Sequence, residues 1–317
     1  MRGKEQADPA SVAFDAVDTG IATGADVVVV GGGVVAVEAA TWMSALGSRV
    51  TMLVRGERLL AGQEDVAGTA VGRALQAKGV DVRLSTSVTA CHREAAKDTG
   101  VGRIHGGPVT VATDSGSVEA DEVLVATGRR PRLDDAGLEA VGLAADDVRA
   151  GHLPPWLHVV GDASGEPPLT HWGKYRARVV GDAIAAAATG RDPLPAPAHA
   201  PVPQVVFTDP QVARVGMTEA EAREAGHDII VKVQQYGDTA YGWAMEDTTG
   251  FCKLIAERGT GRLLGAHLIG PQAPTVIQPV IQAMHFGQTA HELARDQYWI
   301  HPAMPEVLEN AILGLDI

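Results

Sequence analysis

The chain has 317 residues, of which 45% are hydrophobic and 21% charged, which is enough for two or three packed domains. Its formal net charge of −13 argues against nucleic acid or an anionic membrane as the main partner. No apolar run approaches the roughly 20 residues of a membrane span, and the N-terminus lacks the apolar stretch of a signal peptide. We therefore expect a cytoplasmic protein.

The first 120 residues predict a nucleotide-binding unit after a short lead-in. Residues 1–24 are expected to be weakly structured, and residues 25–120 to form the nucleotide-binding domain. The expected elements are a strand, glycine turn, helix and strand over 26–54, a helix over 64–78, a strand over 80–84 and short β-like pieces over 87–119.

The remaining chain divides at a proline-rich segment, GRDPLPAPAHAPVP over 190–203. Before it, DEVLVATGRRP (121–131) and LHVVGDAS (157–164) each predict a strand that ends in a glycine turn, and a helix is expected over 172–188. After it, strands and helices mix in an α+β pattern. A capping box, Thr218 with Glu221, predicts one helix start there.

A second helix is expected after Pro302. Its apolar residues recur at helical spacing and predict one buried face, made of Met304, Val307, Leu308, Ala311 and Ile312.

The segment VVVVGGGVVAVEAA carries the pattern of a dinucleotide-binding turn. Gly31, Gly33 and Ala36 fill the G-x-G-x-x-G/A spacing directly after an apolar strand and before a helix. Gly31 permits the tight turn, Gly33 lets the backbone approach a pyrophosphate, and Ala36 allows close packing of helix on strand. The positive end of the helix then faces the anion, so we predict a dinucleotide site here.

The residues after the second strand favour NADPH as the coenzyme. An NAD site usually carries an acidic residue there, which binds the ribose 2′-hydroxyl. This chain instead has Arg55, followed by Arg58, and guanidinium groups suit a 2′-phosphate. Glu57 lies close by, which keeps NAD possible.

Five motifs in chain order resemble the flavoprotein disulfide reductases, a family that includes glutathione reductase and lipoamide dehydrogenase. They are GGGVVAVE, VLVATGRRP, HVVGDAS with LTH after it, VVFTDPQVARVGMTEAEA and HPAMPE. The closing YWIHPAMPEVLENAILGL is most similar to the mycothione reductases, which reduce the disulfide of mycothiol. The resemblance implies an α/β fold with a Rossmann-like nucleotide-binding domain, a partial FAD-binding domain over 121–195 and an α+β dimerisation domain over 196–317.

The resemblance also implies cofactor contacts. It places Glu38 at the nicotinamide side of the site, and Gly128 and Arg129 in a turn near FAD and the nucleotide. Asp162 matches the carboxylate that binds the flavin ribitol, and Thr170 matches a further flavin-contacting position. A carboxylate accepts hydrogen bonds from hydroxyl groups, which suits this role for Asp162. The residues alone also allow a surface carboxylate at Glu38 and an ordinary Gly-Asp turn at Asp162.

His301 and Glu306 match the catalytic pair of the family. The resemblance assigns His301 to proton transfer with the thiol that exchanges with a small-molecule disulfide, while Glu306 accepts the imidazole N–H and fixes its tautomer. In the family this His serves the disulfide of the other subunit, which implies a homodimer. From the residues alone, a helix-capping His with a Glu in the first helical turn is the alternative.

The sequence has no counterpart of the family's first FAD-binding half, which carries its own glycine fingerprint and a C-x4-C redox disulfide. Cys91 and Cys252 are far apart and are expected to be structural thiols. Without redox cysteines the disulfide exchange step is missing. We therefore expect a truncated reductase, or one subunit of a split enzyme whose FAD half is a separate chain. DEVLVATG and LHVVGD would then lack neighbouring parallel strands.

Two further functions stay open on the sequence. One is a non-catalytic, dimeric NAD(P)-binding remnant, which would bind NADPH without electron transfer. The other is a flavin-free dehydrogenase that uses the single dinucleotide turn, for which only the His301–Glu306 pair could act on a substrate. No metal site is expected because the 11 His residues show no metal-binding spacing.

Overall fold

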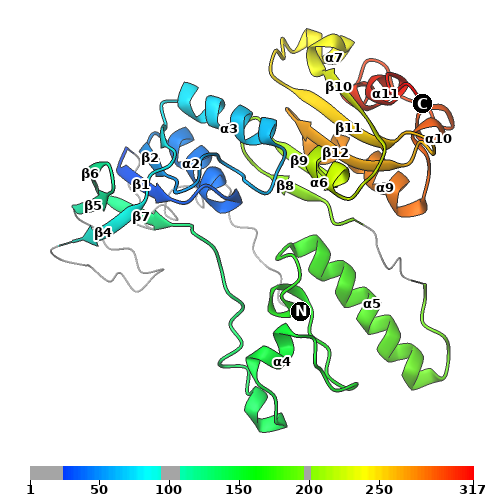
Figure 1. Ribbon diagram of the computed structural model, residues 1–317, viewed down its shortest axis with the longest axis horizontal. Helices are drawn as coiled ribbons and strands as arrows, with labels where there is room; N and C mark the ends of the chain where they lie inside the picture. The colour runs from blue at the N-terminus through cyan, green and yellow to red at the C-terminus, as the bar shows by residue number, and fades with distance from the viewer. Residues whose placement is uncertain (1–23, 94–107, 196–200) are drawn as a thin grey trace, which may run out of the picture.

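The computed structural model describes residues 24–93, 108–195 and 201–317. The lead-in lies outside the described residues except for Gly24, and so does the middle of the proline-rich segment. The described residues form three sheets (Figure 1). None of the helices in this part of the chain has both the length and the apolar character that crossing a bilayer requires.

A four-stranded parallel sheet carries the glycine turn. Its order is β3-β2-β1-β7, and its strands are β1 (Asp26–Val30), β2 (Arg49–Leu53), β3 (Asp81–Arg83) and β7 (Glu122–Val125). Helices α2 (Val34–Ala45) and α3 (Asp65–Ala77) pack on one face through a shared apolar core. Val27, Val28 and Val29 are all buried, as expected for a parallel strand that is covered on both faces.

A three-stranded antiparallel sheet covers the other face. Its strands, in spatial order, are β4 (Val88–His92), β5 (Val109–Thr113) and β6 (Gly116–Ala120). Val109 and Val111 of β5 pack with Val28 and Leu53 of the parallel sheet. The alternation of buried and exposed residues at the start of β5 places its apolar side chains toward that sheet.

Strand β7 corrects one expectation from the sequence. The prediction that DEVLVATG lacks a neighbouring parallel strand is wrong, because β7 pairs in parallel with β1, with Val27 opposite Glu122. The strand predicted within LHVVGDAS is also wrong: residues 157–160 form no strand, and a 3-10 helix, η3 (Gly161–Ser164), follows. No described strand pairs with this segment, so its backbone has no ladder to join.

The segment between β7 and the proline-rich linker lies apart from the sheets (Figure 1). Its elements are η2 (Leu138–Val141), α4 (Ala145–Arg149), η3 and α5 (Thr170–Thr189). The helix predicted over 172–188 is confirmed by α5, which has 20 residues. Within α5 itself only Ala186 is buried, so this helix has little apolar core of its own.

A five-stranded antiparallel sheet forms the C-terminal part, in the order β10-β11-β12-β9-β8. Its strands are β8 (Gln204–Val206), β9 (Val212–Gly216), β10 (Ile229–Gln235), β11 (Phe251–Glu257) and β12 (Leu263–Ile269). The helical elements around it are α6 (Glu219–Glu224), η4 (Tyr236–Asp238), α7 (Ala240–Ala244), α8 (Ala273–Val276), α9 (Gln278–Phe286), α10 (Ala290–Arg295) and α11 (Glu306–Leu313).

Two local predictions in this part are confirmed. The Thr218 hydroxyl accepts the Glu221 N–H at 3.2 Å, and the Glu221 carboxylate accepts the Thr218 N–H at 2.7 Å, which completes the capping box of α6. Helix α11 buries its predicted apolar face, and it starts at Glu306, four residues after Pro302. The fold class predicted from the sequence, a Rossmann-like α/β unit with an α+β C-terminal part, is therefore confirmed.

Candidate functional site

The glycine turn joins β1 to α2 with a geometry that only glycine supports at its first position. Gly31 has φ +133°, and a Cβ there would lie 2.4 Å from the Ala126 carbonyl oxygen. The Gly31 N–H donates to the Leu53 carbonyl at 3.0 Å, which holds the turn against β2. Ala36 is fully buried, so the small side chain allows α2 to approach β1 closely.

The third glycine opens the turn toward a ligand. Gly33 is the N-cap residue of α2, it has no side chain to cap the first amides, and a Cβ there would meet no atom within 4 Å. The free backbone N–H groups at this helix start carry partial positive charge. The residues present therefore fit a pyrophosphate at this turn.

Glu38 has a structural partner in the C-terminal part. Its Oε1 accepts the Phe207 N–H at 2.7 Å, directly after β8. The carboxylate therefore links α2 to the five-stranded sheet. In this structure its described contact is with backbone, so the expected role at the nicotinamide side stays a prediction.

The two arginines after β2 differ in their surroundings. Arg58 forms an ion pair with Asp65 and donates to the Ala61 carbonyl at 2.7 Å. Arg55 is exposed and forms no ion pair with any residue in the described part of the chain. Arg55 is therefore the more available cation for a 2′-phosphate.

We expect Arg55→Ala to weaken NADP⁺ binding about tenfold while changing NAD⁺ binding little, because a charge-assisted hydrogen bond contributes about 1.5 kcal/mol or more. Arg58→Ala is the matched control and should have the smaller effect on NADP⁺, since this side chain is already paired. Isothermal titration calorimetry with both coenzymes measures the difference. An equal loss for NADP⁺ and NAD⁺ in Arg55→Ala would contradict the assignment.

The residues assigned to flavin are all exposed in the described structure. Arg129 Nη1 lies 3.6 Å from Asp162 Oδ2, and their side chains are 65% and 62% exposed. Gly128 has φ +132°, which allows the turn after β7, and Thr170 starts α5. The structure thus brings Arg129 and Asp162 together, and both side chains are largely open to solvent.

The predicted catalytic pair forms a short hydrogen bond. His301 Nδ1 lies 2.6 Å from Glu306 Oε1, and Glu306 Oε2 accepts the Ala303 N–H at 2.9 Å. Burial raises the pKa of Glu306, but the hydrogen bonds from His301 and Ala303 outweigh it and leave this pKa below its ordinary value. An ionised Glu306 holds the proton of neutral His301 on Nδ1, which leaves Nε2 able to accept a proton.

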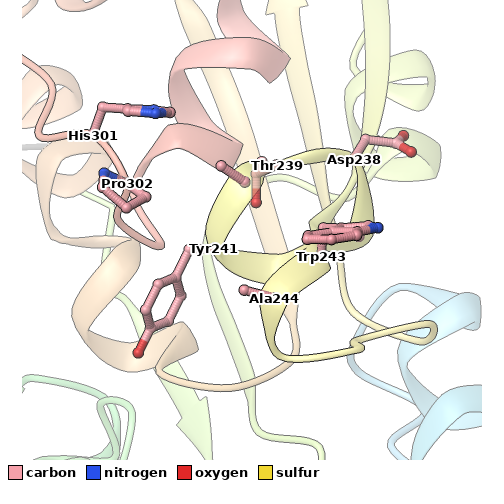
Figure 2. Close-up of a pocket in the computed structure, with 9 residues that line it drawn as sticks. Asp238, Thr239, Tyr241, Trp243, Ala244, His301 and Pro302 are labelled. Carbon is pink, nitrogen blue, oxygen red and sulfur yellow. The ribbon is translucent and has the colours of Figure 1, made fainter.

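The pair borders a hollow of about 470 Å³ (Figure 2). His301 and Pro302 line one part of it, and η4 with α7 supplies the rest, including Asp238, Tyr241 and Trp243. The His301 side chain is 70% exposed, while Glu306 is 13% exposed behind it. Glu306 therefore orients the imidazole from its buried side, and the opposite side of the ring is open to a reactant. Sequence reasoning missed the η4–α7 side because it lies about sixty residues from His301.

The two cysteines cannot act together. Cys91 is exposed on β4, and Cys252 is buried on β11 in a different sheet. Burial raises the pKa of Cys252, which makes its thiolate scarce at neutral pH. Among the described residues no group of three or more His, Cys, Asp or Glu side chains is arranged to hold a metal.

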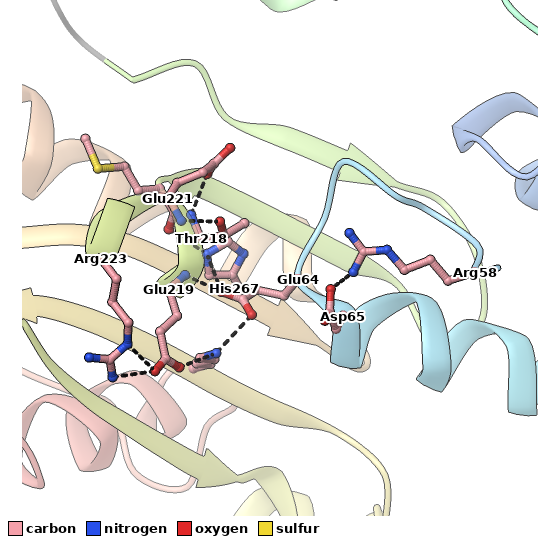
Figure 3. Close-up of polar contacts among 10 residues, drawn as sticks. Arg58, Glu64, Asp65, Thr218, Glu219, Glu221, Arg223 and His267 are labelled. Carbon is pink, nitrogen blue, oxygen red and sulfur yellow. Dashed lines mark hydrogen bonds and ion pairs between the residues drawn. The ribbon is translucent and has the colours of Figure 1, made fainter. Parts of the chain in front are cut away.

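Sequence reasoning also missed a largely buried polar cluster, which we call the junction: Glu64, Glu219 and His267, which Figure 3 labels, together with Lys253. Lys253 Nζ lies 2.9 Å from Glu64 Oε2 and 2.9 Å from Glu219 Oε2. The Glu219 N–H donates to Glu64 Oε1 at 2.6 Å, and His267 Nε2 lies 2.9 Å from the Met217 carbonyl. A lysine inside the apolar strand FCKLIAE was the available signal, since a buried lysine needs a partner.

The junction joins the two packed parts of the chain. Glu64 directly precedes α3, which packs on the parallel sheet, while Lys253 and His267 lie on β11 and β12. Val206, Val212 and Ile269 of the five-stranded sheet also share an apolar core with β1 and α2. The site on α11 is thereby fixed relative to the glycine turn by both polar and apolar contacts.

Comparisons with known proteins agree with this arrangement. The family model "Pyridine nucleotide-disulphide oxidoreductase" matches residues 5–171, and "Pyridine nucleotide-disulphide oxidoreductase, dimerisation domain" matches residues 202–312. A mycothione reductase of Mycobacterium tuberculosis is 45% identical over 91% of this chain and 62% of its own length. A dihydrolipoyl dehydrogenase of Bacillus subtilis is 32% identical over 90% of this chain and 59% of its own length.

A solved structure shows the same fold. The HOCl-induced flavoprotein disulfide reductase RclA from Escherichia coli superposes with a TM-score of 0.75 at 27% identity, over 91% of this chain and 64% of that one. The chain spans about three fifths of the length of the curated relatives it matches. From the two family matches and the shared fold, the chain belongs to the pyridine nucleotide-disulphide oxidoreductase family.

Proposed function

We propose that the chain supplies the nucleotide-binding and dimerisation domains of an NADPH-dependent flavin disulfide oxidoreductase of the mycothione reductase type. The observation that carries the proposal is the His301–Glu306 pair, with a 2.6 Å hydrogen bond and an exposed imidazole beside a hollow. Such a pair suits proton exchange with a thiol. The 45% identity to a mycothione reductase supports a small thiol disulfide as substrate.

Each predicted site residue has a place in this proposal. The turn at Gly31, Gly33 and Ala36 binds the NADPH pyrophosphate, with Arg55 at the 2′-phosphate and Arg58 in support. The remaining predicted contacts to nicotinamide and flavin are Glu38, Gly128, Arg129, Asp162 and Thr170. When bound, FAD would accept hydride from NADPH and pass the electrons to a disulfide.

We further infer that this chain does not complete the reaction alone. Cys91 and Cys252 lie in different sheets, so the dithiol that His301 serves must come from other polypeptide. The proposal therefore combines a cytoplasmic homodimer of this chain with an FAD-binding half that a separate chain supplies. The exposure of the Arg129 and Asp162 side chains also supports the alternative of a non-catalytic, dimeric NAD(P)-binding remnant.

The visible absorption spectrum of the purified chain, followed by addition of NADPH, tests the proposal. We expect a colourless chain that leaves NADPH unoxidised, and a flavin band that bleaches with NADPH once the FAD half of a mycothione reductase is added. In that mixture, His301→Ala should keep bleaching but lower disulfide reduction by about 100-fold or more. A mixture that binds NADPH yet shows neither flavin nor turnover would favour the remnant.

A further inference from the structure

A row of four polar side chains crosses one face of the five-stranded sheet. The four residues lie opposite one another in register on the adjacent strands β8, β9, β12 and β11, and they are Gln204, Arg214, His267 and Lys253. Residues directly opposite each other in antiparallel strands project from the same face. We call these four residues the polar row. Because His267 and Lys253 are buried, this row needs polar partners in whatever packs against it.

The partners of the polar row include one short segment of the part built on the parallel sheet. We call this segment, residues 59–64, the connector, and it ends directly before α3. Three successive connector residues each contact one member of the row: Arg214 Nη1 donates to the Gly62 carbonyl at 2.7 Å, Gln63 Nε2 donates to Gln204 Oε1 at 3.0 Å, and Lys253 Nζ lies 2.9 Å from Glu64 Oε2. The C-terminal sheet therefore fixes the second half of the connector.

The first half of the connector supports the glycine turn. The Leu60 N–H donates to the Gly32 carbonyl at 2.8 Å, and a Cβ on Gly32 would lie 3.4 Å from Leu59 Cδ2. Leu59 and Leu60 are both buried. The Ala61 carbonyl accepts the hydrogen bond from Arg58. The middle residue of the turn and one of the two arginines after β2 thus both rest on the connector.

Leu60 has a backbone conformation that its surroundings must hold in place. Its φ is +50°, in the left-handed region that is unfavourable for a residue with a side chain. Such a conformation persists where the structure on both sides fixes it. The glycine turn and the apolar core act on one side of Leu60, and the polar row acts on the other through residues 62–64. Loosening the row lets Leu60 relax and breaks its hydrogen bond to Gly32.

We propose that the polar row is a positioning element for the coenzyme site, and that Arg214 holds the glycine turn in its binding shape through Gly62 and Leu60. The inference rests on the proposed function, because it requires a coenzyme pyrophosphate at Gly31 and Gly33. Arg214 acts through the connector and is a positioning residue. By linkage, a bound coenzyme strengthens the contact between the connector and the C-terminal sheet by the same factor.

Calorimetry on the full chain with NADP⁺ and NAD⁺ tests the inference. Arg214 is half-buried, and Arg214→Met keeps an unbranched apolar side chain but loses the donor to Gly62. We expect it to weaken both coenzymes about fivefold, because both carry the pyrophosphate. Arg214→Lys, which keeps a donor, should restore most of the affinity.

Arg258→Met is the matched control. Arg258 also donates to a backbone carbonyl in this sheet, that of Ile229, but it lies beyond the end of β11, five residues along from Lys253. Its replacement should change either affinity less than about twofold. Equal thermal unfolding of the two variants checks that the difference lies in the connector and not in overall stability.

Hydrogen exchange gives a second measurement that needs no coenzyme. The amides of Leu60 and Gln63, which donate to Gly32 and to the Leu60 carbonyl, should exchange about fivefold faster in Arg214→Met than in wild type or Arg258→Met. A wild-type chain that binds neither coenzyme would overturn the proposed function and the inference with it. Normal coenzyme binding by Arg214→Met, equal losses in Arg258→Met, or unchanged exchange at Leu60 would overturn the inference alone.

Discussion

Replacing Lys253 by methionine is expected to lower the free energy of unfolding by about 3–5 kcal/mol. Lys253 lies between Glu64 and Glu219, and the side chains of Lys253 and Glu64 are 11% and 9% exposed. Methionine fills a similar volume but leaves the buried Glu64 carboxylate without its lysine partner, while Glu219 keeps only its ion pair with Arg223. The loss therefore comes from uncompensated buried charge rather than from a cavity.

The chain offers a matched control for this substitution. Lys78 forms an ion pair with Asp209 and also connects the part built on the parallel sheet to the C-terminal part, but the two side chains are 40% and 77% exposed. Lys78→Met should therefore change stability by less than about 1 kcal/mol. Urea unfolding followed by circular dichroism compares the two variants. Similar losses in both would show that burial of the junction does not matter.

The pH dependence of the junction has a defined sign. Burial lowers the pKa of His267 from its ordinary value of 6.5, so the folded chain keeps this ring neutral while the unfolded chain takes up a proton. Stability should therefore fall as the pH drops below about 6.5. Hydrogen bonds from Lys253 and Arg223 hold the pKa of Glu219 below 4.5. The contribution of ionised Glu219 to the free energy of unfolding is therefore fully present above pH 4.5 and is lost in stronger acid.

The Lys253→Met variant should respond differently to acid. Without the cation, proton uptake relieves the repulsion between Glu64 and Glu219, which wild type does not experience. The stability gap between wild type and variant is therefore expected to narrow as the pH falls from 7.5 toward 4.5. A difference in stability that stays constant across this range would show that Lys253→Met destabilises the fold through packing and not through charge.

Local features of this fold were predictable because they depend on short spacing along the chain. The glycine turn, the Thr218–Glu221 capping box and the buried face of α11 all follow from residues within one or two helical turns of each other. The His301–Glu306 contact belongs to this class, since the two residues are five positions apart. In such cases periodicity and capping chemistry determine the structure.

Features that need distant partners were not predictable. Lys253 and Glu64 are 189 residues apart, and nothing near either residue specifies the other. The segment LHVVGDAS has the apolar pattern of a strand, but a strand also needs a neighbouring backbone to pair with. For the same reason the sequence spacing alone could not predict that the aromatic residues of α7 lie beside His301.

Gly31→Ala is expected to lower the free energy of unfolding by about 2–4 kcal/mol and to abolish measurable NADPH binding. The added Cβ would lie 2.4 Å from the Ala126 carbonyl oxygen, and φ at this position is +133°. Ala126 directly follows β7, and its N–H donates to the Val30 carbonyl at 2.8 Å. The substitution therefore forces β1 and β7 apart at the point where the turn begins. Thermal unfolding and coenzyme calorimetry measure the two effects.

Gly33→Ala separates binding from folding at the same turn. Gly33 has φ −85°, which alanine adopts without strain, and its Cβ would meet no atom within 4 Å. Stability should therefore stay within about 0.5 kcal/mol of wild type. NADPH affinity should still fall about tenfold or more, because the methyl group occupies the space through which a pyrophosphate reaches the backbone amides. If the Gly33→Ala chain binds NADPH normally, the nucleotide does not bind at this helix start. If it loses NADPH affinity but keeps its stability, the result supports a pyrophosphate at this position.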